Sequence, residues 1–123
     1  MFISAIDIKS TLKKSYCNQI HMVDIVLSNE TNRRVNSNGG RTPVSLSYHW
    51  RDLCGNIVVW DGLRTPLFRD LEPGDTIETA VMIQAPARSG EYVLEVTGVQ
   101  EGALWANVTS KNEACNEVQI TVV

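Results

Sequence analysis

Short hydrophobic runs alternate with polar turns along this chain, and the clearest pattern lies within residues 43–68. Apolar and polar residues alternate over 44–51, in the order VSLSYHWR. A period of two predicts a β-strand with one face in the core and the other in water. The core face carries Trp50, and the wet face carries Ser47 and His49. Residues 54–56, Cys-Gly-Asn, then predict a turn into a second strand.

The remaining hydrophobic runs complete a set of seven or eight predicted strands. They cover residues 2–9, 20–28, 57–59, 77–83, 91–100, 104–108 and 117–122. In the first run the alternation places Ala5 and Asp7 on the outer face. Residues 29–42 predict a long exposed loop or a hairpin with a short edge strand. Pro73-Gly74 predicts a turn in which the glycine adopts a positive φ.

These elements predict an all-β fold, since no segment shows the period of an amphipathic helix. Frequent turns between short strands are typical of an immunoglobulin-like antiparallel β-sandwich, with a jelly roll as the alternative. In the first arrangement the strands that contain Trp50, Tyr92 and Trp105 share one sheet, and Trp50 is buried. Tyr92 follows a glycine at the start of its strand, so we expect a tyrosine corner, in which the hydroxyl binds an upstream backbone group.

Length and charge narrow the classes of function. The 123 residues fit one domain, 1–123, which is large enough to bury its own core. The formal net charge of -3 provides no basic field for nucleic-acid binding. Neither a secretion signal nor an apolar run of roughly 18 residues is visible, so we expect a cytoplasmic chain without direct membrane insertion.

Cysteine and histidine positions give little support to a disulfide framework, a metal site or catalysis. Three cysteines without C-x-x-C spacing favour reduced thiols over a single Cys17–Cys115 bridge. His21 lies on an apolar strand face and is expected to be an end-of-strand imidazole or a partnered core imidazole, and not a ligand. Familiar catalytic motifs are missing from the sequence, so we expect no enzyme, no cofactor and no metal. His49 could form a two-carboxylate or metal cluster with Asp24, Glu95 and Glu101 only if their strands happened to align.

Sugar binding fits the candidate residues better. Sugar rings have an apolar C–H face that stacks on flat aromatics, and hydroxyls that bind carboxylates, amides and guanidinium groups. Trp60 and Trp105 lie beside predicted loops, although a half-buried edge residue and a core residue are the competing interpretations. Arg64 and the arginines of residues 29–42 leave room for an anionic chain terminus. The candidate carbohydrate-binding residues are Ser47, His49, Trp60, Arg64, Glu95, Thr97, Glu101 and Trp105.

Several short motifs, in order, resemble a known family. They are PVSLSYHWRD, VVWDGLRTPL, the L-x-PGD turn, APARSGEYVLEV and VQEGALW. Together they are similar to the carbohydrate-binding C-terminal domain on the ATPase subunits of ABC transporters that export O-polysaccharides, the Wzt type. The resemblance covers residues 20–123.

The resemblance implies a non-catalytic sandwich on the cytoplasmic side that recognises a lipid-linked O-antigen polysaccharide, often at its non-reducing end. Such a module passes the glycan to the ATPase and membrane subunits of the transporter, and it is expected to form a homodimer. The chain contains no Walker A loop, so ATP hydrolysis is not expected of it. The alternative is a protein–protein adaptor or dimerisation sandwich without a glycan ligand, with Met82, Val93 and Val99 exposed at an interface.

Overall fold

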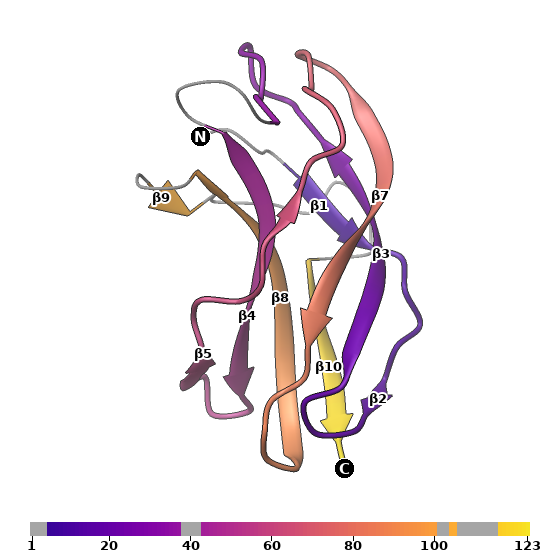
Figure 1. Ribbon diagram of the computed structural model, residues 1–123, viewed down its shortest axis with the longest axis vertical. Helices are drawn as coiled ribbons and strands as arrows, with labels where there is room; N and C mark the ends of the chain where they lie inside the picture. Colours follow the sequence, from indigo (N-terminus) through magenta and orange to yellow (C-terminus); the bar gives the residue numbers. More distant parts are fainter. Residues whose placement is uncertain (1–4, 38–42, 101–103, 106–115) are drawn as a thin grey trace.

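The computed structural model describes residues 5–37, 43–100, 104–105 and 116–123, and this part of the chain is an all-β sandwich. Two sheets face each other (Figure 1). The smaller sheet has the order β1-β3-β7, with β1 at Ala5–Ile8, β3 at Ile20–Ser28 and β7 at Thr76–Gln84. The larger has the order β2-β10-β8-β4-β5, with β2 at Lys14–Ser15, β10 at Glu117–Val122, β8 at Gly90–Gln100, β4 at Val44–Asp52 and β5 at Ile57–Val59. Two further strands join it: β6 (Thr65–Pro66) pairs with β4, and β9 (Leu104–Trp105) pairs with β8.

The hydrophobic core lies between the sheets, and the inward face of β4 supplies its aromatic centre. Trp50 is completely buried, as the alternation predicted, and its ring meets Tyr48 and Tyr92 edge to face. The indole N–H of Trp50 donates to the Gln84 carbonyl at 2.9 Å, and the Gln84 N–H donates to the Tyr48 hydroxyl at 3.0 Å. Both aromatic polar groups are thereby satisfied inside the core. The same bonds join β4 of one sheet to β7 of the other.

Strands β4 and β8 form the centre of the larger sheet. Their antiparallel register places Ser47 opposite Thr97 and His49 opposite Glu95. Strand β9 pairs with the other edge of β8, so the predicted grouping of the Trp50, Tyr92 and Trp105 strands in one sheet is confirmed. The Tyr92 hydroxyl donates to the Arg88 carbonyl at 2.8 Å, which confirms the predicted bond to upstream backbone.

Both predicted glycine turns are present. Gly74 has a φ of 86°, and the Asp75 N–H closes the turn by donating to the Glu72 carbonyl at 3.0 Å. Gly55 has a φ of 88° in the β4–β5 turn. Glycine carries no Cβ, so it adopts these left-handed conformations with little strain.

Burial departs from the predicted alternation at several outward positions, among them Ala5, Asp7 and Val99. Ala5 and Asp7 of β1 are both 1% exposed, so all four residues of this strand are buried and it shows no in–out pattern. Val99 is also buried, at 5% exposed, so it does not form the exposed interface expected with Met82 and Val93. Met82 is exposed, and Val93 is partly buried.

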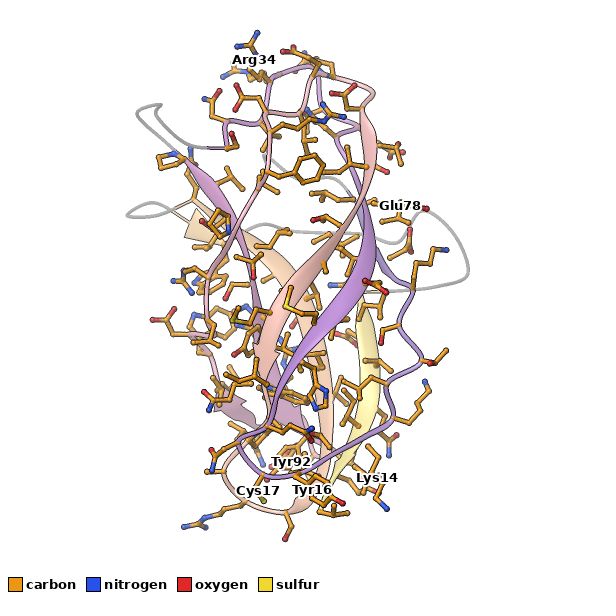
Figure 2. All side chains as sticks on the ribbon, turned by 45° about the vertical axis from the view of Figure 1, so that its right-hand side comes forward. Lys14, Tyr16, Cys17, Arg34, Glu78 and Tyr92 are labelled. Carbon is orange, nitrogen blue, oxygen red and sulfur yellow. The ribbon has the colours of Figure 1, made fainter. Side chains whose placement is uncertain are left out.

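Residues 29–37, which follow β3, make specific contacts with the rest of the sandwich. Asn29 is fully buried, and its amide donates to the carbonyls of Arg33 at 2.7 Å and Leu71 at 3.1 Å. Arg34 forms an ion pair with Glu72 at 2.7 Å. Figure 2 places Arg34 at one end of the sandwich and Tyr92 at the other.

Strand β2 was not predicted and pairs in parallel with the end of β10. Next to it, His21 Nε2 lies 2.8 Å from the Ser15 hydroxyl, so the expectation of a partnered imidazole is confirmed. The Cys17 thiol donates to a backbone carbonyl at 3.5 Å. Cys115 lies outside the described residues, as does Arg41.

Candidate functional site

The candidate site is built over the outer face of β4 by the segment that joins β5 to β6, residues 60–64. Both ends of this segment pair with the same edge of β4, through Val59 opposite Trp50 and Thr65 opposite Leu46. The 60–64 segment therefore remains beside β4. A covering segment needs hydrogen-bond donors for its backbone carbonyls wherever they lose contact with water.

Two outward side chains of β4 supply those donors. The Ser47 hydroxyl donates to the Leu63 carbonyl at 2.8 Å. Nδ1 of His49 contacts the Trp60 carbonyl closely, and because a carbonyl only accepts, Nδ1 carries the proton. Gly62 fits against Tyr48 because it has no side chain: a Cβ there would lie 2.7 Å from the Tyr48 carbonyl oxygen. The 60–64 segment is thus anchored by specific residues of β4.

This arrangement corrects the predicted wet face. Ser47 is 0% exposed, His49 3% and Thr97 1%, although all three were expected to face solvent beside a sugar. Their parity was right, because they do point away from the inter-sheet core. Alternation along a strand cannot reveal that a distant segment covers the outer face. Ser47 and His49 contact that segment directly.

The aromatic rings form a compact group around His49. The His49 and Trp60 rings lie face to face, with centroids 3.7 Å apart and planes 7° apart. Trp105 meets both edge to face, at 4.5 Å from His49 and 5.6 Å from Trp60. Trp60 remains 44% exposed. His49 covers one face of its indole, and Trp105 contacts the ring edge to face, so Trp60 is exposed only where these two rings leave it uncovered.

Arg64 connects the aromatic group to the 60–64 segment. Its Nη1 donates to the Gly62 carbonyl at 2.8 Å and to the Ser47 hydroxyl at 3.2 Å. Its Nη2 lies 2.7 Å from Asp61 Oδ1. The guanidinium carbon is 4.9 Å from the ring centroid of Trp105, within cation–π range. Five of the predicted residues, Ser47, His49, Trp60, Arg64 and Trp105, are therefore brought together.

Glu95 lies beside this group in an ion pair. Its carboxylate contacts Arg51, which also lies 3.8 Å from Glu117. Thr97 lies one outward position further along β8. Glu101, the eighth candidate, falls outside the described residues.

The electrostatics of the group favour a neutral His49. Burial is the largest cause and lowers the pKa of His49 from 6.5. The Trp60 carbonyl and Glu95 act in the opposite direction and favour the charged form, whereas Arg51 and Arg64 lower the pKa further. The neutral imidazole keeps its proton on Nδ1, as the Trp60 contact requires.

The list of candidate residues omitted two contributors to this site, Asp61 and Gly62. Asp61 is three residues before Arg64, and this spacing was the visible signal for their ion pair. Gly62 offered no comparable signal, because its role depends on Tyr48, a residue of another strand.

The expected alternative cluster of His49 with carboxylates does not include Asp24. Asp24 belongs to β3 in the smaller sheet and lines a hollow of about 550 Å³ with Lys9 and Glu78. Within the described ranges, no three His, Cys, Asp or Glu side chains converge as metal ligands. The described part of the chain also contains no helix able to cross a membrane.

Comparisons with known proteins identify a similar fold. No protein-family model matches the chain, and no curated protein matches it. Among solved structures, the CARDB domain of the PF1109 protein from Pyrococcus furiosus, crystallised in complex with di-metal ions, is similar at 18% sequence identity and a TM-score of 0.50. The match covers 99% of this chain and 94% of that one. At this identity the likeness supports the β-sandwich fold alone.

Proposed function

We propose that this chain is a non-catalytic carbohydrate-binding module, in which Trp60 stacks against one ring of a bacterial cell-surface polysaccharide. The observation that carries the proposal is the half-exposed indole of Trp60, held by the parallel ring of His49 on its other face. A ring supported in this way loses little freedom when a ligand stacks on it, and such preorganisation favours binding.

Polar groups beside Trp60 complement this aromatic surface. The Asp61 side chain is 73% exposed and is positioned by Arg64. Carboxylates accept hydrogen bonds from sugar hydroxyls, while the indole face covers the apolar C–H side of the ring. The hollow next to Asp24 has no aromatic side chain in its lining, so it fits this chemistry less well.

The motif resemblance supports a more specific role within the proposal. The glycan would be a lipid-linked O-antigen recognised through its non-reducing end. Recognition would couple it to export by an ABC transporter at the cytoplasmic side of the membrane. As one of a pair of such domains, the module would act as a homodimer.

A protein-binding role is the second candidate, and the β4–β5 hairpin favours it. Leu53, Ile57 and Val58 are 57%, 55% and 43% exposed on this hairpin. Adjacent exposed apolar side chains commonly mark protein contacts. Such a surface also accommodates a homodimer of a glycan-binding module.

Titration with polysaccharide tests the proposal. Affinity electrophoresis first identifies bacterial surface polysaccharides that retain the protein. Each of these polysaccharides is then titrated into the wild type, Trp60→Ala and Phe68→Ala, and the affinities are compared. Phe68 is 63% exposed, and its ring lies under Arg69 and not in the aromatic group, so it is the matched control. We expect Trp60→Ala to weaken binding by about fivefold or more, about 1 kcal/mol, and Phe68→Ala to leave it unchanged. Equal affinity for Trp60→Ala, or no retention by any polysaccharide, would contradict the proposal.

A further inference from the structure

We infer that this site selects an uncharged sugar and discriminates against uronic acids and other anionic sugars. The inference rests on the proposed function and concerns the charges around Trp60. It begins with the arginines, which are the residues that would otherwise attract an anion.

The guanidinium of Arg64 is engaged in contacts within the protein. This guanidinium contacts the Asp61 carboxylate, the Gly62 carbonyl and the Ser47 hydroxyl, and lies over the ring of Trp105. An anionic sugar that sought a bidentate contact with Arg64 would compete with Asp61 at 2.7 Å. Arg64 therefore acts as a support for the site.

The guanidinium of Arg51 is likewise engaged in contacts within the protein. Its guanidinium pairs with Glu95 and lies 3.8 Å from Glu117. Among the described residues, ion pairs on this outer face join two arginines to three carboxylates, those of Asp61, Glu95 and Glu117. The carboxylate side chains of Asp61 and Glu117 are 73% and 51% exposed, against 31% for Arg64 and 28% for Arg51. Of these four described side chains, the most exposed is the carboxylate of Asp61, the residue that directly follows Trp60.

Among the arginines of residues 29–42, which with Arg64 suggested an anionic chain terminus, Arg34 lies far from Trp60 along β4. Arg34 pairs with Glu72 and lies two residues before Asn36, whose carbonyl bonds to Val44 at the start of β4. At the other end of β4, Trp50 pairs with Val59, the residue that precedes Trp60. Val44 and Trp50 are six residues apart along β4, a distance of about 20 Å. Arg34 therefore cannot compensate an anion stacked on Trp60.

An exposed carboxylate beside an aromatic ring suits a neutral sugar. Asp61 Oδ1 accepts from Arg64, and a carboxylate has about four acceptor positions, so it retains capacity for sugar hydroxyls. A second carboxylate, on the sugar, would offer no hydrogen and would repel Asp61.

The test uses the polysaccharide that binds in the experiment above, in matched neutral and acidic forms. Oxidation of primary hydroxyls makes the acidic form of a neutral polymer, and carboxyl reduction makes the neutral form of an acidic one. At low salt we expect the neutral form to bind about tenfold more tightly. Asp61→Asn should narrow this ratio, whereas Glu72→Gln, which alters the acid–arginine pair at the other end of β4, should leave it unchanged.

Equal or tighter binding of the acidic form, lost in Arg64→Gln, would overturn this inference while leaving the proposed function intact. Failure of both forms and of every other polysaccharide to bind would instead count against the proposed function. The two failures are therefore distinguishable.

Discussion

The imidazole of His49 lies flat on the indole of Trp60, with centroids 3.7 Å apart and planes 7° apart. Nδ1 of the same imidazole binds the Trp60 backbone carbonyl. One buried side chain of β4 therefore fixes both the backbone and the ring of Trp60. His49 is 3% exposed, so its contribution to a ligand is made through the position of Trp60.

The first prediction concerns pH. We expect the free energy of unfolding to fall as the pH drops below about 6.5. Burial lowers the pKa of His49 from 6.5, so just below this pH the unfolded chain binds a proton that the folded chain does not. The contribution is complete above the unfolded pKa and is lost as the pH falls towards the folded pKa, with a slope of at most about 1.4 kcal/mol per pH unit. Urea unfolding from about pH 8 to pH 5 measures it.

His49→Phe is the matched variant, because it keeps a flat ring and cannot take up a proton. It leaves the Trp60 carbonyl without its donor, so we expect a loss of about 1–3 kcal/mol at pH 8 and a smaller decline towards pH 5. Backbone hydrogen bonds lower the pKa values of Asp52, Asp70 and Asp75 from 3.8, so their contributions disappear only in more acidic solution. An equal decline in wild type and His49→Phe would show that another group is responsible.

The second prediction concerns Gly62. Its alanine variant would place a Cβ 2.7 Å from the Tyr48 carbonyl oxygen, so the 60–64 segment must move. We expect a loss of about 1–3 kcal/mol in the free energy of unfolding, together with weaker glycan binding. Gly74→Ala is the control: it strains a positive φ of 86° in a distant turn and should destabilise the fold without changing affinity in the folded protein. Unaltered binding by Gly62→Ala would argue against the role of this close contact.

The third prediction concerns the tyrosine corner. Tyr92→Phe removes the 2.8 Å bond to the Arg88 carbonyl and leaves the buried ring in place. We expect a loss of about 0.5–1.5 kcal/mol, measured by chemical unfolding. Tyr16→Phe, at a ring that is 68% exposed, should have no effect. Glycan affinity should be unchanged in both variants, and a loss of affinity in Tyr92→Phe would mean that this end of the sandwich also affects the site.

Local patterns predicted much of the sandwich. The alternation in β4 identified Trp50 as a core residue, and the Pro73-Gly74 pair identified a turn with a positive φ at Gly74. Such features depend on neighbours in sequence, so the sequence displays them directly. The parallel pairing of β2 with β10 depends on residues more than a hundred positions apart and was missed.

The sequence indicated which residues gather at the candidate site better than it indicated which of them are exposed. Trp60, Trp105 and Arg64 do meet, as their aromatic and charged character suggested. The prediction that Ser47 and His49 are exposed was wrong, because the 60–64 segment covers the polar face of β4. A segment anchored through its backbone carbonyls leaves no hydrophobic pattern of its own. The polar residues that looked available to a ligand were the donors that this segment requires.

The central claim is that a glycan stacks on Trp60, and the indole N–H signals of the three tryptophans test it most directly. During titration of ¹⁵N-labelled protein with a retained polysaccharide, we predict that the Trp60 signal shifts in a saturable manner. The Trp50 signal should remain unchanged, because its N–H is buried and bonded to the Gln84 carbonyl. Saturable binding that leaves the Trp60 signal unmoved would contradict the account.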